Sequence, residues 1–432
     1  MSSIDTKYGW FCSTLFKQIY SDIDGNWRPC CYGSRSHSRE GEKTIYNTKP
    51  LEYFLSDEMN EYRRMTLSGE VPDICQKCKR YEDQGFMSYR QMENTQSNID
   101  DILESADHFI KTGKIKFDKR FIFLKLKIFG NYCNLKCFMC HPQNSSSRQT
   151  ELIGMTKKYD YDFLKKWGQP KAEVSIEKTL QYEEVIKEVI KISPYIESLE
   201  IIGGEPLMMK NHYDLLDKLI GTNHAKDIRL KYVTNLTKLK HGNRNFLPYI
   251  QKFKDSHFNI SIDGIYERGE WLRYGLVFDD LIDNLNSLRD ETNNISLAFT
   301  ASNLSILYAT EMYDYFTFEQ GMQIKYMDRN IVTEPQMLDP RHLPDNLKQN
   351  LINEFEDHVH AHKFKGLVEL LKNPRNESLF DLGMKYIKTV NDFRKTNVGE
   401  LFPELKEHIE AAEMDFYNDP EYYLREMGKP IH

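Results

Sequence analysis

The alternation of strand-like and helix-like segments is the feature that most constrains the fold of this 432-residue chain. Amphipathic stretches, such as residues 182–192 and 213–220, separate short apolar runs. The strands we expect are residues 121–128, 198–202, 228–233, 258–262, 295–300 and 323–326. Strands that alternate with helices form parallel βα units. Six strands are too few for a closed eight-stranded barrel, so we expect an α/β fold with a partial six-stranded (β/α) TIM-like barrel.

The two flanks of this alternating region differ from it. Residues 1–115 are turn-rich, and Asp24-Gly25-Asn26 is a strong hairpin signal, so we expect a small N-terminal β-hairpin module followed by a linker helix. After Pro335 the pattern becomes helical and charged, most clearly in residues 347–355, 367–371 and 405–414, and we expect a helical C-terminal cap. The expected domains are therefore residues 1–115, 116–335 and 336–432.

Composition excludes some classes of protein. No uninterrupted apolar run approaches the roughly 18 residues of a membrane span, and the N-terminus lacks the apolar stretch of a signal peptide. We therefore expect a cytoplasmic protein without a membrane partner. The net charge of −7 does not favour a broad surface for nucleic acid.

Eight cysteines in a chain without an export signal indicate metal binding rather than disulfides, because reducing compartments keep thiols free. They fall into two sets. Five lie within the first 78 residues and three lie between residues 133 and 140, directly after the first expected barrel strand.

The second set, Cys133, Cys137 and Cys140, brings three thiolates into one small volume without a fourth. Iron–sulfur clusters are normally held by four protein ligands, so a trio leaves one iron open to a substrate or cosubstrate. A partial zinc site is the alternative, because zinc also takes cysteine ligands.

Polar residues follow later strands of the expected sheet. Gly203-Gly204-Glu205-Pro206 comes after residues 198–202, and its paired glycines permit a ligand to approach the backbone while the carboxylate can receive an ammonium group. Thr234 with Asn235, and Ser261 with Asp263, stand at the next two strand ends. In parallel sheets, chemistry is located at the carboxyl ends of the strands.

Together, the cysteine spacing and the Gly-Gly-Glu-Pro turn resemble the radical S-adenosylmethionine (radical SAM) enzymes. The resemblance implies a [4Fe-4S] cluster on Cys133, Cys137 and Cys140, with S-adenosylmethionine chelating the fourth iron. It also implies reductive cleavage to methionine and a 5'-deoxyadenosyl radical that removes a hydrogen atom from the substrate, and an electron donor such as ferredoxin or flavodoxin.

The resemblance further implies contacts to S-adenosylmethionine. Arg273 matches a position where relatives place an arginine near the cosubstrate carboxylate, and an ordinary surface arginine is the alternative. Met139 stands where relatives often have an aromatic residue, so we expect either looser packing of the adenine or a thioether that contacts it instead. The full set of expected cosubstrate contacts is Met139, Gly203, Gly204, Glu205, Thr234, Asn235, Ser261, Asp263 and Arg273.

The N-terminal cysteines Cys12, Cys30, Cys75 and Cys78 resemble the auxiliary-cluster half-domain called twitch, which is related to the SPASM domain. This resemblance implies a second, closed [4Fe-4S] cluster that precedes the barrel. A structural zinc site is the alternative. Cys31 could replace Cys30 as the ligand, although the spacing from Gly25 favours Cys30.

Twitch and SPASM relatives favour peptides, so we expect a radical SAM oxidoreductase that modifies a peptide or protein. A sugar, nucleotide or small metabolite is the alternative substrate, and a non-catalytic metal-binding scaffold is the alternative of another class. His358, His360 and His362 are interpreted as a solvated helix face rather than a metal site.

Overall fold

The computed structural model describes residues 8–33, 43–83, 87–96, 99–117, 120–127, 129–159, 164, 182–324 and 327–412. The chain divides into two compact units. Unit 1 consists of Met1–Gly130, Val174–Tyr232 and Lys240–His257, and unit 2 of Asn131–Glu173, Val233–Leu239 and Phe258–His432. The expected domain boundaries at residues 115 and 335 stay predictions.

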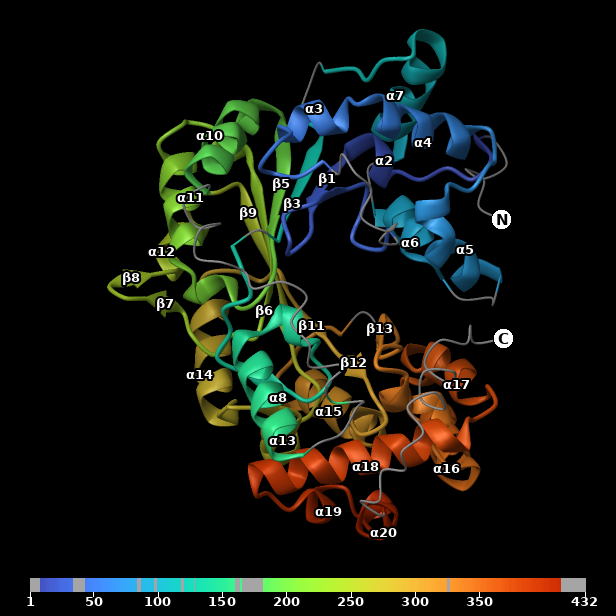
Figure 1. Ribbon diagram of the computed structural model, residues 1–432. Helices are drawn as coiled ribbons and strands as arrows, with labels where there is room; N and C mark the ends of the chain where they lie inside the picture. The colour runs from blue at the N-terminus through green and yellow to red at the C-terminus, as the bar shows by residue number, and fades with distance from the viewer. Residues whose placement is uncertain are drawn as a thin grey trace. The chain divides into compact units, whose positions relative to one another are not determined.

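Unit 1 is built on a parallel sheet, in which neighbouring strands follow the order β6-β5-β3-β1 and β2 pairs with β1 antiparallel (Figure 1). Its strands are β1 (Gln18–Ser21), β2 (Trp27–Arg28), β3 (Ile122–Leu126), β5 (Ile196–Ile201) and β6 (Arg229–Thr234), whose last two residues belong to unit 2, and a separate hairpin pairs β7 (Lys240–His241) with β8 (Arg244–Asn245).

The alternation along β3 shows why this sheet has two different faces. Ile122, Leu124 and Leu126 are completely buried, whereas Phe123 and Lys125 between them are partly exposed. Successive side chains of a strand point to opposite faces, so β3 buries one face in the core and turns the other outward.

The helices of unit 1 follow the expected amphipathic pattern. On α10 (Tyr182–Ile192), Val185, Ile186 and Val189 are buried, and Glu183 and Glu184 occupy the first turn, where the helix dipole favours negative charge. The others are α2 (Thr14–Lys17), α3 (Pro50–Phe54), α4 (Asp57–Leu67), α5 (Gln76–Asp83), α6 (Tyr89–Gln96), α7 (Ile99–Thr112), α11 (Lys210–Ile220) and α12 (Leu247–Ile250).

Unit 2 contains three short strand pairs and most of the C-terminal helices. β9 (Asp255–Ser261, with its first three residues in unit 1) pairs in parallel with β11 (Ile295–Ala298), β12 (Thr300–Ala301) pairs with β13 (Asn330–Ile331), and β4 (Lys136–Cys137) pairs antiparallel with β10 (Arg273–Tyr274). The helices are α8 (Ser146–Lys158), α13 (Tyr266–Leu272), α14 (Phe278–Arg289), α15 (Ala309–Asp314), α16 (Asp345–Asp357), α17 (Lys365–Leu371), α18 (Glu377–Arg394), α19 (Val398–Leu401) and α20 (Lys406–Ala411).

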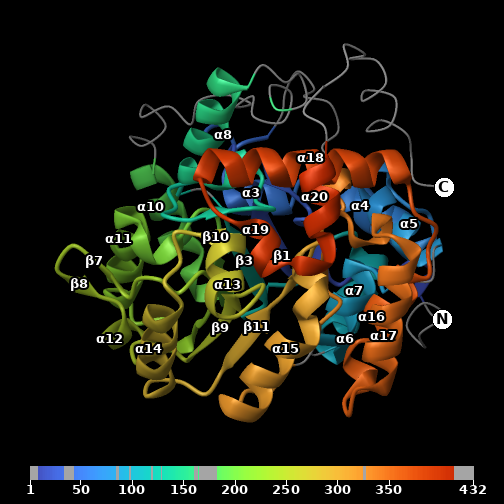
Figure 2. The same ribbon diagram turned by 90° about the horizontal axis from the view of Figure 1, so that it is seen from below.

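The helix α18 is the longest element that the structure describes in unit 2, and α19 and α20 pack against it (Figure 2). It buries one continuous stripe, including Leu379, Leu382, Tyr386 and Val390. Spacings of three and four residues place these side chains on one face of the helix.

Five of the six expected strands are present with slightly different ends, but the six-stranded barrel is not confirmed. Gln323 and Ile324 are not in a strand, and Lys325 and Tyr326 lie outside the described residues. Four alternating residues are too few to distinguish a strand from an extended loop. The N-terminal hairpin was expected to form its own module, whereas β1 pairs in parallel with β3.

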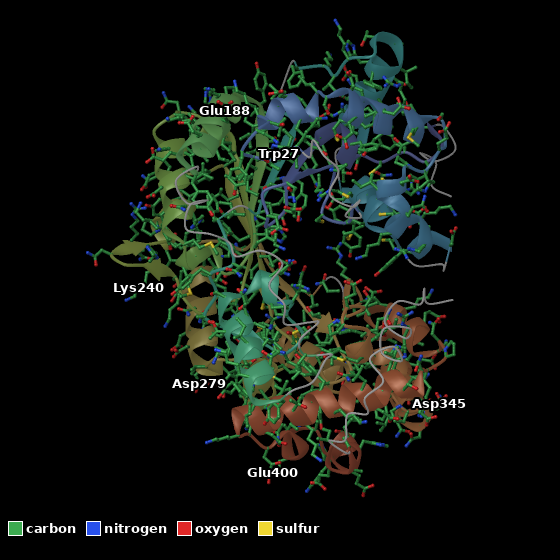
Figure 3. The ribbon with its side chains drawn as sticks, in the orientation of Figure 1. Trp27, Glu188, Lys240, Asp279, Asp345 and Glu400 are labelled. Atoms are coloured by element: carbon green, nitrogen blue, oxygen red, sulfur yellow. The ribbon has the colours of Figure 1, made fainter. Side chains whose placement is uncertain are left out.

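The outer surfaces of both units are charged. Lys240 in unit 1, and Asp279, Asp345 and Glu400 in unit 2, are exposed, whereas Trp27 is buried and donates its Nε1 hydrogen to the Thr48 carbonyl, 2.8 Å away (Figure 3). None of the helices in the described residues is long and apolar enough to cross a membrane.

Candidate functional site

The cysteine trio lies in a loop of unit 2 that a short strand pair fixes. Cys137 on β4 stands opposite Arg273 on β10, and the Phe138 N–H donates to the Leu272 carbonyl at 2.7 Å. The Cys140 N–H donates to the Cys137 carbonyl at 3.0 Å, which closes a turn between these two cysteines. Cys133 and Cys137 are buried, and Cys140 is partly exposed.

The start of α8 supports the first cysteine. Ser146 Oγ accepts a hydrogen bond from the Cys133 N–H at 3.2 Å, Ser147 Oγ donates to the Cys133 carbonyl at 2.6 Å, and Ser145 Oγ donates to the Leu135 carbonyl at 2.8 Å. Ser145 is also the N-cap of α8. Sequence reasoning missed this role, although three consecutive serines before a helix are a recognisable capping signal.

Asn235, which follows β6, directs a side-chain amide at the first cysteine. Its Nδ2 lies 3.7 Å from Cys133 Sγ and 3.2 Å from Asn134 Oδ1, while its Oδ1 accepts from the Thr237 N–H at 3.0 Å. These contacts fix the orientation of the amide. An N–H directed at sulfur stabilises a thiolate, which is the form of cysteine that binds metal.

Arg273 reaches the second cysteine. Its Nη1 lies 3.7 Å from Cys137 Sγ, and its Nη2 lies 2.7 Å from Asp263 Oδ2. Asp263 is itself held by the Thr300 N–H, 2.9 Å from Oδ1. The alternative of a surface arginine is therefore wrong: Arg273 is 8% exposed, its Nε has no hydrogen-bond partner among the described residues, and Asp263 orients it.

Burial raises the pKa of the Cys137 thiol, and Arg273 is the strongest influence that acts to lower it. Burial likewise raises the pKa of Asp263, against the charge of Arg273. The positive guanidinium is thus shared between a carboxylate and a thiol. Bound metal would remove the thiol proton, and Arg273 would then face two anionic partners.

A buried ionic network from two helices holds the backbone of the same loop. Arg394, at the end of α18, donates to the Lys136 carbonyl at 2.5 Å and to the Trp271 carbonyl at 2.9 Å. Its Nε lies 2.8 Å from Glu151 Oε1, and Glu151 also pairs with Arg148 on α8. We call Arg148, Glu151 and Arg394 the arginine brace.

The aromatic residue of the loop is part of the core. Phe138 is completely buried, and its ring centroid lies 5.2 Å from that of Trp271 and 5.5 Å from that of Tyr386. It therefore has no free face for an adenine ring. Met139 beside it is partly exposed, so the expectation that a thioether packs on adenine stays a prediction.

The Gly203-Gly204-Glu205 turn lies in unit 1, at the carboxyl end of β5. Both glycines have positive φ angles, 99° and 50°, which side chains rarely adopt. A Cβ at Gly203 would lie 2.8 Å from Lys127 Cγ. Glu205 is completely buried, and its Oε1 accepts from the Leu207 N–H at 3.2 Å.

The N-terminal cysteines of unit 1 surround a cavity. Cys12, Cys30, Cys75 and Cys78 line it, and Cys31 does not. Its other walls include Trp10, Pro29, Ile74, Tyr32, Tyr89 and Arg90. Within the parts of the chain that the structure describes, no three His, Cys, Asp or Glu side chains are close enough to hold a single metal ion. The four thiols therefore line one small cavity, about 10 Å³, without converging on a single point.

A hydrogen-bond network encloses this cysteine cavity. Arg90 donates to the Phe11 carbonyl at 2.8 Å and pairs with Glu82 at 2.7 Å, and Glu82 also accepts from Ser88 Oγ at 2.5 Å and Trp10 Nε1 at 3.0 Å. Burial raises the pKa of all four cavity thiols, to about 11 for Cys78, while Arg90 acts to lower those of Cys12, Cys75 and Cys78.

Comparison with known proteins identifies the central part of the chain. Residues 127–303 match the family model described as Radical SAM superfamily. This part of the chain is a radical SAM domain. GTP 3',8-cyclase of Thermodesulfovibrio yellowstonii is 26% identical over 197 residues, which are 45% of this chain and 50% of the cyclase. The chain thus spans about half the length of this curated relative.

Two solved structures align with the chain at low scores. Native anSMEcpe with bound S-adenosylmethionine shares 16% identity over 53% of this chain and 58% of its own, with a TM-score of 0.33. Streptococcus suis SuiB bound to S-adenosylmethionine shares 12% identity over 72% of this chain and 68% of its own, with a TM-score of 0.33. Neither bears on the substrate of this chain.

A radical SAM domain implies a [4Fe-4S] cluster and S-adenosylmethionine, and the three cysteines fit the cluster. Three cysteines share one loop, with N–H donors aimed at Cys133 and Cys137. Thr234, Asn235, Ser261, Asp263 and Arg273 lie in unit 2 with the trio, whereas Gly203, Gly204 and Glu205 lie in unit 1. Their contacts with the cosubstrate stay predictions.

Proposed function

We propose that the protein is a radical SAM enzyme that removes a hydrogen atom from a peptide or protein substrate. The observation that carries this proposal is the loop of Cys133, Cys137 and Cys140 inside a radical SAM domain, with Asn235 and Arg273 donating to two of the three sulfur atoms. When bound, the cluster and S-adenosylmethionine supply reductive cleavage to a 5'-deoxyadenosyl radical.

In this proposal, the chain's own residues bind the cluster and orient the cosubstrate. The three thiolates hold three irons and leave one open, and Asn235 and Arg273 stabilise the negative charge on sulfur. We propose that the backbone groups of Gly203 and Gly204, which have positive φ angles, bind the methionyl amine of the cosubstrate, and that Arg273 binds its carboxylate. The arginine brace keeps the loop in one geometry.

We further propose that Cys12, Cys30, Cys75 and Cys78 hold an auxiliary [4Fe-4S] cluster. A [4Fe-4S] cluster takes one thiolate on each iron, whereas one zinc ion requires all sulfur atoms about 2.3 Å from a single point, and no three of the described side chains converge in that way. Such a cluster would accept the electron left after hydrogen abstraction, or would anchor the substrate. Ferredoxin or flavodoxin supplies the first electron.

A nucleotide is the second candidate substrate. The curated relative is named a GTP 3',8-cyclase, and 197 residues of this chain are similar to it. A peptide and a nucleotide are distinguished by product analysis after incubation of the reconstituted enzyme with each.

The test of the proposed function is 5'-deoxyadenosine formation in anaerobically reconstituted protein reduced with dithionite. The wild type and Cys31→Ala should both form it, and Cys137→Ala should not, because only the trio holds the reactive cluster. Cys31→Ala is the matched control for losing one cysteine. Formation that persists in Cys137→Ala would exclude the mechanism, and failure of the wild type to bind S-adenosylmethionine would favour a non-catalytic scaffold.

A further inference from the structure

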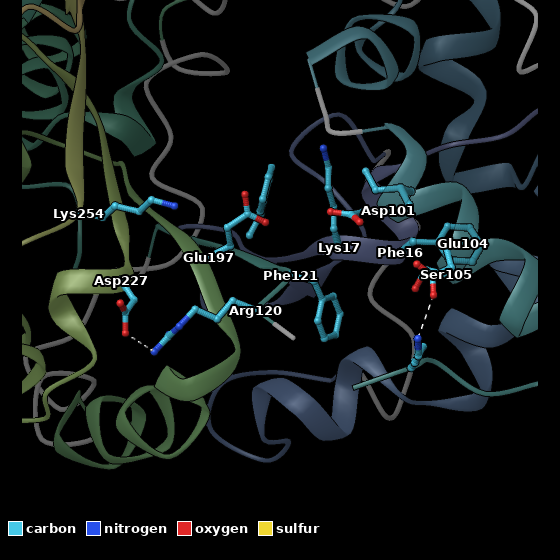
Figure 4. A pocket seen from close by; sticks show the side chains of 13 residues that line it. Phe16, Lys17, Asp101, Glu104, Ser105, Arg120, Phe121, Glu197, Asp227 and Lys254 are labelled. Atoms are coloured by element: carbon cyan, nitrogen blue, oxygen red, sulfur yellow. Dashed lines mark hydrogen bonds and ion pairs between the residues drawn. The ribbon is translucent and has the colours of Figure 1, made fainter. Parts of the chain in front are cut away.

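A cavity of about 250 Å³ in unit 1 has matched charges on its walls (Figure 4). Arg120 lies 3.0 Å from Asp227, and Lys116 lies 2.9 Å from Glu104. In all, four lysine or arginine side chains and four carboxylates line this cavity. Because these charges balance, the cavity gives no preference to an ionic ligand. A polar side chain directed at a single functional atom is found instead in unit 2, beside Cys133.

The side-chain amide of Asn235 uses all of its hydrogen-bonding capacity within the protein. An asparagine side chain accepts two hydrogen bonds at Oδ1 and donates two from Nδ2. Oδ1 of Asn235 accepts from the Thr237 N–H at 3.0 Å and from Thr237 Oγ1 at 2.7 Å. Nδ2 donates to Asn134 Oδ1 at 3.2 Å and to Cys133 Sγ at 3.7 Å. The amide therefore has no donor or acceptor left for a cosubstrate.

Two neighbouring side chains decide which end of this amide faces the sulfur atom. Because both donors of Thr237 lie against Oδ1, the nitrogen is the atom directed at Cys133. Asn134 Nδ2 donates to Thr237 Oγ1 at 2.9 Å, and the nearer acceptor for the Thr237 hydroxyl hydrogen is Asn235 Oδ1. We call Asn134, Asn235 and Thr237 the amide clamp. Asn235 and Thr237 are both buried, so solvent does not compete for these bonds.

The turn that carries Asn235 has a backbone conformation that side chains rarely adopt. Leu236, the next residue, has a φ of 52° and is completely buried. Its N–H donates to Thr234 Oγ1 at 2.9 Å, and its carbonyl accepts from Asn284 Nδ2 on α14 at 2.9 Å. A strained residue persists only where its surroundings hold it, and such residues cluster at functional sites. The strain here lies in the turn that directs Nδ2 of Asn235 at Cys133.

We propose that Asn235 is a positioning residue that raises the reduction potential of the cluster on Cys133, Cys137 and Cys140, rather than a contact of S-adenosylmethionine. This inference rests on the proposed function, because it requires that cluster. The cysteine sulfur atoms are more negative when the cluster holds one more electron, so an N–H donor stabilises the reduced form more than the oxidised form. The electron comes from the ferredoxin or flavodoxin, and Asn235 neither gains nor loses a proton.

The test is the reduction potential of the reactive cluster in the full-length reconstituted protein, measured by electron paramagnetic resonance. The signal of this cluster is the one that Cys137→Ala lacks. At one fixed ambient potential, the ratio of reduced to oxidised cluster should be about fivefold lower or more in Asn235→Asp. The new carboxylate still accepts from Thr237 but directs an oxygen atom at Cys133. Asn235→Ser is too short to reach the sulfur atom, should shift the ratio in the same direction, and replaces Asn235→Asp if that variant does not hold the cluster.

Asn284→Leu is the matched control, because it removes a donor from the same turn and leaves the N–H that faces Cys133. Its potential should equal that of the wild type. The affinity for S-adenosylmethionine should stay within about threefold of the wild type in Asn235→Ser, whereas the loss of a direct contact would lower it about tenfold.

An unchanged potential in the Asn235 variants, an equal shift in Asn284→Leu, or a tenfold loss of affinity in Asn235→Ser would overturn the inference. Formation of 5'-deoxyadenosine by the wild type reports on the proposed function separately. If the wild type forms it and the potential does not depend on Asn235, only this inference fails. If the potential shifts as expected but no 5'-deoxyadenosine is formed, only the proposed function fails.

Discussion

Gly203 combines two constraints at a single residue: a φ of 99° and a Lys127 Cγ atom 2.8 Å from where a Cβ would be. Gly113 shares only the first, with a φ of 69° and no atom within 4 Å. We predict that Gly203→Ala lowers the free energy of unfolding by about 2–3 kcal/mol and Gly113→Ala by about 1 kcal/mol. Urea unfolding of both variants measures the difference, and equal losses would show that the crowding at Gly203 is relieved at no cost.

His212 gives a pH dependence. It is completely buried, its Nε2 lies 2.8 Å from Tyr232 Oη, and burial lowers its pKa to about 3. Because this pKa is lower in the folded state, the unfolded state binds the proton more readily. The stability that neutral His212 contributes is therefore complete above pH ~6.5 and is lost as pH falls toward 3. Between pH 6.5 and 5.5 we expect a loss of about 1 kcal/mol.

Urea unfolding at these two pH values tests this in the wild type and in His212→Asn, which keeps a polar side chain near Tyr232. The variant should lose about 1 kcal/mol less over the same interval. Parallel pH dependence in both proteins would mean that His212 is not the group responsible.

Cys30 and Cys31 are neighbours in sequence with different surroundings, because Cys30 lines the cysteine cavity and Cys31 does not. We predict that Cys30→Ser loses the auxiliary cluster, about four irons per chain, and that Cys31→Ser retains it. Iron analysis after anaerobic reconstitution measures both. If only Cys31→Ser lost iron, Cys31 rather than Cys30 would be the cluster ligand.

At the scale of elements, the arginine brace joins α8 and α18 to the cysteine loop. Glu151 and Arg394 have side chains only 1% exposed, and Arg148 is fully buried. Burial acts to raise the pKa of Glu151, but Arg394 and Arg148 hold it below its usual range. Removing Arg394 would leave Glu151 paired with Arg148 alone and would leave the Lys136 and Trp271 carbonyls without this donor.

We therefore predict that Arg394→Met destabilises the protein by about 2–4 kcal/mol and speeds loss of iron from the trio, because the Lys136 and Trp271 carbonyls lose their donor. Arg64→Met is the control. Its exposed pair with Glu61 should contribute less than about 1 kcal/mol. Thermal unfolding and the rate of iron release under a chelator measure both effects. If Arg394→Met retained iron as the wild type does, the arginine brace would not be what stabilises the cysteine loop.

Local patterns allowed some of these elements to be predicted. The apolar alternation of β3 and the cysteine spacing are properties of neighbouring residues, so the sequence alone located them. The contact between Glu151 and Arg394 spans 243 positions and leaves no local signal. Similarly, the residues next to Lys231 in the sequence do not indicate that Glu200 on β5 and Lys17 before β1 lie on the same face of the sheet as Lys231. The pairing of β1 with β3 was missed because strand propensity does not specify the partner strand.

At the scale of the whole molecule, the two cysteine sets belong to different compact units. The four cavity cysteines lie in unit 1 and the trio in unit 2. Because neither proposed ligand set includes a residue of the other unit, we expect each proposed cluster to survive the loss of the other. The radical SAM domain spans residues 127–303 and so includes segments of both units.

The most direct test of the account is the content of iron, acid-labile sulfide and zinc in anaerobically reconstituted protein. We predict about eight irons and eight sulfides per chain in the wild type, and about four of each in both Cys75→Ser and Cys137→Ala. About four irons with one zinc would keep the reactive cluster and make the N-terminal site structural. Zinc without iron would contradict the central claim that this chain holds a radical-generating cluster.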